Sequence, residues 1–320
     1  MDARVSPDPA CGSVAIPAAC PQDGGAARGV CAATGSFLLR YTPPYDWEAL
    51  LAWFRHHQLP DLEEIIDGTY ERVFRTAQGL AWFRVSRDAK RRALRVTVEG
   101  APEDELPRIE AAIRRMFDVD ADPKVIGQAM GQEPNLGELW ARHPGVRVAR
   151  AWSGYEATVT TILGQLVSVS FGRILVRELM KTTGSPALHP FTGRPIYLFP
   201  TPEQLVQADL AGVRTATTRR AAIRAVADLV LNGTLDWQKP VEHKTLRKTL
   251  LSAPGIGAWT AEYVAMRGFR DNDAFPATDY GLKQELARRP TMKVDRVRPW
   301  RAYAAALLWA SYGEAKKEAQ

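Results

Sequence analysis

The sequence predicts an α+β protein that is mostly α-helical, with a small antiparallel α+β domain preceding a helical body. Two observations carry this prediction. Strand patterns occur only within residues 36–120, whereas helical periodicity dominates the chain after residue 120. The hydrophobic content of 46% over 320 residues is typical of a globular protein with ample material for a buried core.

Residues 1–35 have the composition of a linker. They are rich in Ala, Gly and Pro and show no hydrophobic period, which predicts a disordered leader. Two arginines and three aspartates give this segment a charge of −1. Because the whole chain has a net charge of +6, residues 36–320 carry +7. A basic body favours a polyanionic partner, although many basic proteins bind no nucleic acid. The leader also holds the three cysteines, whose wide spacing suits neither a zinc site nor a disulfide scaffold: Cys11, Cys20 and Cys31.

The α+β domain is expected at residues 36–120. Its first strand is Phe37-Leu38-Leu39-Arg40-Tyr41, and Asp46 is a candidate N-cap for a helix that runs to His57. Gln78-Gly79 suits a hairpin turn between two of the later strands. Alternation of apolar and polar residues, followed by helical spacing, predicts the remaining elements: strands at 70–74, 80–85 and 93–98, and a helix at about 104–117.

No strand cluster is expected after residue 120. A periodic stretch at 154–181 is interrupted at Gly164-Gln165, and Thr201 with Pro202 marks the start of a later helix. Further helices are expected at 218–232 and 300–312. The sequence has no apolar run of membrane-spanning length and no secretory start, so we expect a cytoplasmic protein without membrane contact.

Two helices at 242–268 meet at Pro254-Gly255-Ile256-Gly257. The glycines permit a tight turn and a close backbone approach, Ile256 can pack between the helices, and the free N–H groups can bind a phosphate. A plain αα-hairpin has the same pattern, and such clamps also occur in proteins that do no base chemistry.

Asp279 follows the hairpin, directly before another predicted helix. It suits a helix N-cap, and a helix start also stabilises a carboxylate, so both roles are compatible. Asp279 lies 22 residues after Gly257. With an aspartate at this distance from the hairpin, the sequence resembles the helix-hairpin-helix DNA glycosylase superfamily, and the resemblance implies that Asp279 is catalytic. Breaking an N-glycosidic bond builds positive charge on the sugar, which one ionised carboxylate can stabilise.

Trp259 occupies the position where bifunctional members of the superfamily place a lysine that forms a Schiff base. The second helix of the hairpin has no lysine, and no cysteine follows Cys31. We therefore expect neither lyase activity nor an iron–sulfur cluster. A glycosylase for oxidised or deaminated bases and a non-catalytic DNA-binding protein remain as alternatives.

Further segments resemble DNA-3-methyladenine glycosylases II of the AlkA type, over about Leu39 to Gly313: Pro43-Pro44-Tyr45-Asp46-Trp47, Ile162-Leu163-Gly164-Gln165-Leu166-Val167-Ser168, Phe199-Pro200-Thr201-Pro202 and Pro299-Trp300-Arg301-Ala302-Tyr303. The resemblance implies a base pocket of Trp53, Trp259, Tyr263 and Trp309. Each ring alone could be core packing, and we assign Trp47 and Trp300 to the core. Together, electron-rich rings attract a cationic alkylated base by roughly 1–2 kcal/mol each.

The same resemblance implies further roles. Leu166 would enter the base stack with Gln165 beside it, although a leucine after a helix break is usually core. The carbonyls of Leu251, Ala253 and Ile256 would hold a structural Na⁺ or K⁺ beside the phosphate-binding hairpin, and no cofactor would be needed for catalysis. Two helical domains, 121–153 with 272–320 and 154–271, would flank a cleft. The partner would be double-stranded DNA with damaged bases, and the protein a monomer.

The sequence departs from this family at several places. Thr278 stands where a second aspartate is frequent, which suggests that Asp279 suffices. Ala310 follows Trp309 in place of an aromatic residue, so we expect a more open pocket. Residues 186–198 look longer than usual. The leader has no counterpart in the glycosylase and resembles a linker left from fusion to a methyl-accepting regulatory domain.

Overall fold

The computed structural model describes residues 33–237, 239 and 241–318, and the part from Ala33 onward belongs to one compact unit. The predicted leader up to residue 32, with its three cysteines, lies outside the described residues. The first strand begins at Ala33, so residues 33–35 belong to the sheet and the predicted leader boundary at residue 35 is wrong.

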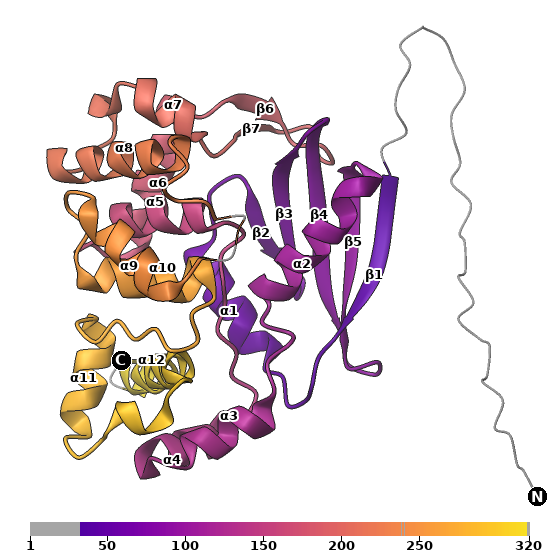
Figure 1. Ribbon diagram of the computed structural model, residues 1–320. Coiled ribbons are helices and arrows are strands. Elements are labelled where there is room, and N and C mark those ends of the chain that lie inside the picture. Colours follow the sequence, from indigo (N-terminus) through magenta and orange to yellow (C-terminus); the bar gives the residue numbers. More distant parts are fainter. Residues whose placement is uncertain (1–32, 238, 240, 319–320) are drawn as a thin grey trace, which may run out of the picture. The chain divides into compact units, whose positions relative to one another are not determined.

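The N-terminal part contains an antiparallel five-stranded sheet with the order β1-β5-β4-β3-β2 (Figure 1). All four predicted strands are present. A fifth, edge strand was missed, because Glu63-Glu64-Ile65-Ile66 shows no alternation of apolar and polar residues. The strands are β1 (Ala33–Arg40), β2 (Glu63–Ile66), β3 (Thr69–Thr76), β4 (Gly79–Asp88) and β5 (Ala93–Ala101).

Two helices, α1 (Trp47–His57) and α2 (Leu106–Met116), share one hydrophobic cluster with the sheet. The carboxylate of Asp46 accepts from the N–H of Ala49, which confirms its N-cap role. The core assignment of Trp47 is also confirmed, because the side chain is buried and its indole N–H donates to the carbonyl of Gly68 at 3.0 Å. A short 3₁₀ helix, η1 (Glu103–Glu105), precedes α2.

The rest of the described chain is mainly helical (Figure 1). The predicted break at Gly164-Gln165 and the Thr201 cap with Pro202 are confirmed. The elements are α3 (Pro123–Met130), α4 (Pro134–Arg142), α5 (Gly154–Gly164), α6 (Val169–Thr183), α7 (Pro202–Gln207), η2 (Leu210–Gly212), α8 (Thr217–Leu231), α9 (His243–Ser252), α10 (Ala258–Phe269), α11 (Tyr280–Arg288), η3 (Val294–Val297) and α12 (Arg301–Glu318).

The prediction of no strands after residue 120 is wrong. A two-stranded hairpin, β6 (Pro186–Leu188) and β7 (Pro195–Tyr197), occupies the segment that the sequence marked as unusually long. Each strand is three residues long and starts with a proline, so neither offers a period to detect. The β6–β7 hairpin lies against the five-stranded sheet. The ring centres of Phe191 and Trp82 are 5.1 Å apart, and Arg194 forms an ion pair with Glu64 of β2.

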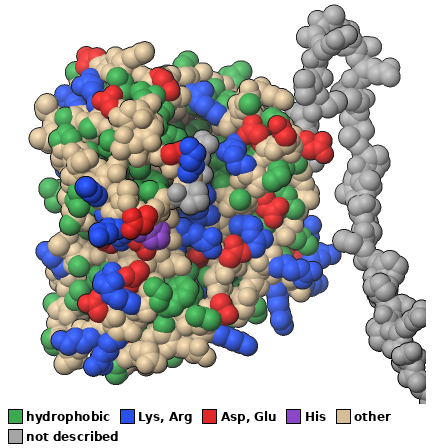
Figure 2. Space-filling model, in the orientation of Figure 1, with side chains coloured by type: hydrophobic (Ala, Val, Ile, Leu, Met, Phe, Trp, Pro, Cys, Tyr) green, Lys and Arg blue, Asp and Glu red, His purple; other side chains and the backbone are tan. Residues whose placement is uncertain are grey.

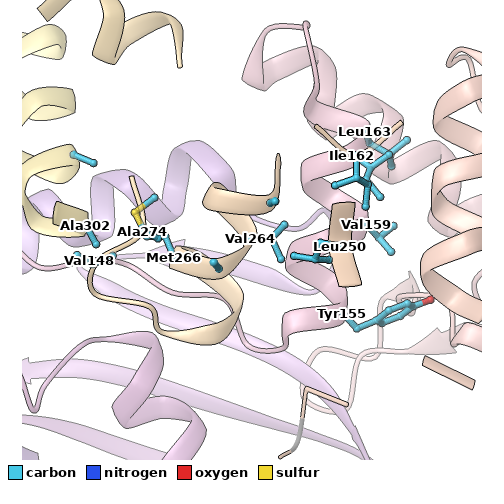
Figure 3. Packing of buried hydrophobic residues seen from close by; sticks show 14 of the residues in the cluster. Val148, Tyr155, Val159, Ile162, Leu163, Leu250, Val264, Met266, Ala274 and Ala302 are labelled. Carbon is cyan, nitrogen blue, oxygen red and sulfur yellow. The ribbon is translucent and has the colours of Figure 1, made fainter. Parts of the chain in front are cut away.

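One hydrophobic cluster runs through the helical part (Figure 3). It includes Val159 and Ile162 of α5, Leu250 of α9 and Val264 of α10, so the hairpin helices are anchored in the same core as α5. This core also reaches Ala302 of α12. Among the described helices none alone is long and apolar enough to cross a membrane; α5 and α6 meet that criterion only as a pair, bent by 119°.

Candidate active site

The helix-hairpin-helix motif forms as predicted between α9 and α10. Gly255 adopts a left-handed conformation with φ +78, and Ile256 is buried between the helices. Gly257 is the N-cap of α10 and offers no side chain to its first N–H groups. The turn therefore presents an uncapped helix start with exposed glycines on either side of Ile256, which suits a phosphate group.

Gln165 and Leu166 lie at the break between α5 and α6. The Gln165 side-chain amide donates to the carbonyl of Gly255 at 3.1 Å and to the hydroxyl of Thr260 at 2.8 Å. Gln165 thus ties the break to the hairpin. Leu166 is 99% exposed and left-handed at φ +55. A leucine is rarely found in this strained conformation, and full exposure excludes the core-packing interpretation.

Asp279 caps α11, with its Oδ1 accepting from the N–H of Leu282 at 3.2 Å. The same oxygen accepts from the indole N–H of Trp309 at 2.8 Å, and Oδ2 accepts from the indole N–H of Trp259 at 3.2 Å. The cap role is therefore confirmed, and the two indoles hold both carboxylate oxygens in a fixed orientation. The structure brings together three residues that the sequence assigned to one site.

The four predicted pocket aromatics lie at one place, although they come from three helices. Trp259 and Tyr263, one turn apart on α10, stack at 5.3 Å with an interplanar angle of 21°. Trp309 of α12 meets Tyr263 edge-on at 6.0 Å. Trp53 of α1 joins them through a shared neighbour, the guanidinium of Arg267. All four rings are half-buried.

Arg267 is one of two residues that the sequence analysis missed. It is buried on α10, and its guanidinium carbon lies 4.3 Å from the ring centre of Trp53, 5.1 Å from that of Trp309 and 5.4 Å from that of Tyr263. Burial lowers the pKa of Arg267, while the nearby Tyr263 opposes this effect. The spacing could have revealed it, because residues 259, 263 and 267 fall four apart on one helix face.

His57 is a second residue missed by the sequence analysis. Its ring stacks on Trp53 at 4.2 Å, and its Nδ1 lies 2.9 Å from the carbonyl oxygen of Trp53. Burial lowers the pKa of His57 to about 3. The imidazole is therefore neutral at ordinary pH, and Trp53 lies in contact with both His57 and Arg267.

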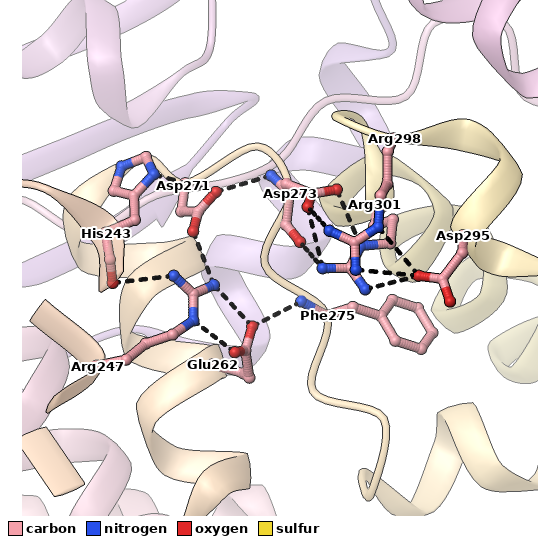
Figure 4. A network of polar contacts seen from close by, with 9 residues as sticks. All are labelled: His243, Arg247, Glu262, Asp271, Asp273, Phe275, Asp295, Arg298 and Arg301. Atoms are coloured by element: carbon pink, nitrogen blue, oxygen red, sulfur yellow. Dashed lines mark hydrogen bonds and ion pairs between the residues drawn. The ribbon is translucent and has the colours of Figure 1, made fainter. Parts of the chain in front are cut away.

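The segment that leads to Asp279 is held by ionic contacts (Figure 4). Arg247 of α9 binds Asp271 at 2.7 Å and pairs with Glu262 of α10, which also accepts from the backbone N–H of Phe275 at 3.0 Å. Arg301 of α12 binds Asp273 at 2.9 Å. The hairpin helices and α12 thus fix the chain just before the catalytic candidate.

The remaining predicted features have clear places. Thr278 is exposed beside Asp279, and Ala310 is half-buried after Trp309. Trp300 is half-buried and packs edge-on against Tyr303 at the margin of the core. The carbonyl of Ala253 accepts the N–H of Ile256 at 3.3 Å, so one of the three expected cation ligands also takes part in the turn. On the face seen in Figure 2, Lys and Arg side chains are spread among acidic ones.

Comparison with known proteins places this chain in a family. The model of the AlkA N-terminal domain matches residues 36–153. The chain is 31% identical to DNA-3-methyladenine glycosylase 2 of Escherichia coli over 291 residues, covering 88% of this chain and all of that protein. It is 33% identical to a probable bifunctional transcriptional activator/DNA repair enzyme AlkA of Mycobacterium tuberculosis, of which it covers 58%.

A solved structure has the same fold. The 3-methyladenine DNA-glycosylase from Archaeoglobus fulgidus superposes with a TM-score of 0.72 at 18% identity, covering 87% of this chain and 98% of that one. The sequence match over the whole length of the Escherichia coli protein is the stronger finding. The chain therefore belongs to the DNA-3-methyladenine glycosylase 2 family of the AlkA type.

Proposed function

We propose that the protein is a monofunctional DNA glycosylase that removes alkylated bases, such as 3-methyladenine and 7-methylguanine, from double-stranded DNA. The observation that carries this proposal is the carboxylate of Asp279, which two indole N–H groups hold at the edge of an aromatic cluster. The names of the relatives supply the substrate class.

The proposed reaction is hydrolysis of the N-glycosidic bond after the damaged nucleotide has left the base stack. As the bond breaks, positive charge develops on the sugar, and the carboxylate of Asp279 stabilises it and orients a water for attack. An alkylated purine that already carries a positive charge leaves as a neutral base, so no strong general acid is required. The indoles of Trp259 and Trp309 keep the carboxylate from rotating.

Strand cleavage is not part of the proposed activity. A lyase needs an amine nucleophile beside the sugar, and the residue at the corresponding place of α10 is Trp259. Its indole N–H is already used to bind Asp279. No lysine occurs anywhere in α10, which supports a purely hydrolytic reaction.

DNA would be held by backbone contacts and a wedge. The turn Pro254–Gly257 and the start of α10 would bind a phosphate, with a monovalent cation on the carbonyls of Leu251, Ala253 and Ile256. Leu166, exposed and left-handed, would fill the space that the flipped base leaves. The link from Gln165 to the hairpin would fix the distance between the wedge and the phosphate clamp. We propose that the protein acts as a monomer.

The test uses methylated plasmid DNA and measures released bases together with abasic sites. We expect Asp279→Asn to lower base release by at least roughly a hundredfold, because the developing charge loses its partner. Asparagine also caps helices well, so α11 should remain intact. The matched control is Asp122→Asn, since Asp122 caps α3 in the same way and is not part of the site; it should release bases like the wild type.

Each alternative has its own signature in this assay. No release of alkylated bases by the wild type would reject the proposed activity. Nicking of the DNA without added alkali or lyase would reject monofunctional hydrolysis. Release undiminished in Asp279→Asn would remove Asp279 from catalysis, and release of only oxidised or deaminated bases would favour the alternative substrate class.

A further inference from the structure

Arg267 places a positive charge at the aromatic pocket. Its side chain is 4% exposed, and its guanidinium carbon lies within 5.4 Å of the ring centres of Trp53, Tyr263 and Trp309. These are three of the four rings that the sequence analysis assigned to binding a cationic base. The cation that they contact in the structure belongs to the protein.

The guanidinium is buried and lacks an ion-pair partner among the described residues. One terminal N–H donates to the carbonyl of Ala149 at 2.6 Å, while Nε is buried without a hydrogen bond. Arginine keeps its charge in proteins, because its pKa is so high. Burial lowers the pKa of Arg267, whereas Tyr263 and the negative charge of Asp279 raise it, so these two groups share the stabilisation of the guanidinium with the three aromatic faces.

A bound cationic base would consequently meet two opposite influences. Asp279 attracts it, whereas Arg267 repels it and already occupies the attractive faces of three rings. Trp259 contacts Asp279 and stacks on Tyr263, and it is the one ring of the four whose faces Arg267 does not contact. A neutral base gains the stacking without the repulsion.

We propose that Arg267 is a specificity-determining residue that lowers the preference of this pocket for cationic over neutral damaged purines. This inference rests on the proposed glycosylase function and names a residue that sets its selectivity. A fixed positive charge at the pocket weakens the binding of a cationic base relative to a neutral one. Screening by Asp279 reduces the effect, so we expect a change in selectivity of roughly tenfold.

The experiment offers two purine lesions in one mixed single-turnover reaction, on duplexes of the same sequence with different fluorescent labels. One duplex carries 7-methylguanine, which is cationic, and the other carries hypoxanthine, which is neutral. The ratio of the two release rates does not depend on how much of the preparation is active. The variants are Arg267→Met, which is neutral and long, Arg267→Gln, which is neutral and keeps an N–H for Ala149, and Arg267→Lys, which keeps the charge.

We expect both neutral variants to raise the ratio of 7-methylguanine to hypoxanthine release by roughly tenfold, and Arg267→Lys to leave it within about twofold. A loss of both activities by the same factor in the neutral variants would overturn the inference, because it would make Arg267 a structural strut only. Wild-type release of 7-methylguanine without hypoxanthine would also overturn it. Release of neither base by the wild type would instead reject the proposed function itself.

Discussion

Lowering the pH from 8 to 5 is expected to destabilise the protein through His57. In the folded protein, burial lowers the pKa of His57 from 6.5 to about 3, and the positive charge of Arg267 acts in the same direction. The unfolded chain therefore takes up a proton on His57 between about pH 6.5 and 3, while the folded protein does not. Stability from this group is complete above pH 6.5 and falls as the pH decreases through that window.

The size of the effect follows from the two pKa values. At pH 5, which is about 1.5 units below the pKa of 6.5 in the unfolded chain, protonation of His57 stabilises the unfolded state by about 2 kcal/mol. The folded protein gains almost nothing, because its His57 has a pKa of about 3. This is a large part of the stability of a typical domain. Protonation of His57 in the folded state would place a second cation against Trp53, which already contacts Arg267.

The assay is urea unfolding of the wild type and of His57→Gln across pH 5 to 8. The wild type should lose about 2 kcal/mol more over this range than the variant. The control is His56→Gln, which should keep more of the wild-type pH dependence than His57→Gln does. The pKa of His56 is lowered in the same direction, but His56 is more exposed and its ring does not stack on Trp53. Equal pH dependence of wild type and His57→Gln, or an NMR titration midpoint of His57 above pH 5, would refute the reasoning.

Two further predictions concern left-handed residues near the hairpin. Leu166→Gly should raise the free energy of unfolding by about 1 kcal/mol by removing strain, yet slow base release from duplex DNA roughly tenfold, since the wedge is lost; unchanged release would argue against a wedge. Gly255→Ala should lower the free energy of unfolding by about 1–2 kcal/mol, because alanine is strained at φ +78. Gly257 has φ −96 and open space around it, so Gly257→Ala should lower the free energy of unfolding by less than Gly255→Ala does. Thermal melts of the two variants measure this difference, and a larger loss for Gly257→Ala would contradict this account.

The parts of the fold with a strong local pattern could be predicted from the sequence. Helix starts with a side-chain cap, such as those at Asp46 and Thr201, and the glycine turn of the hairpin were all found at the expected positions. The strands β6 and β7 were not, because their pairing depends on contacts such as that of Phe191 with Trp82. Short strands without a period are determined by tertiary contacts that a local pattern does not contain.

The candidate site divides in a similar way. Asp279 and its indole partners were predicted because their residue types are rare and chemically suited to the reaction. Arg267 was missed because an arginine on a helix is usually exposed, and the groups that its guanidinium contacts, such as the carbonyl of Ala149, are distant in the sequence. His57 was missed because only the fold shows that its ring is stacked on Trp53.

Several residues at the hairpin and the aromatic pocket break ordinary local rules. Leu166 is exposed in a strained conformation, Arg267 is buried without an ion pair among the described residues, and the start of α10 has no side-chain cap. Helices such as α5 and α6, by contrast, begin with capping serines. Each exception costs stability, and the folded protein tolerates it because the surrounding core is regular. Substitutions that remove these exceptions should therefore tend to stabilise the protein while impairing its action on DNA, which is the pattern expected of a binding site that must stay open to its ligand.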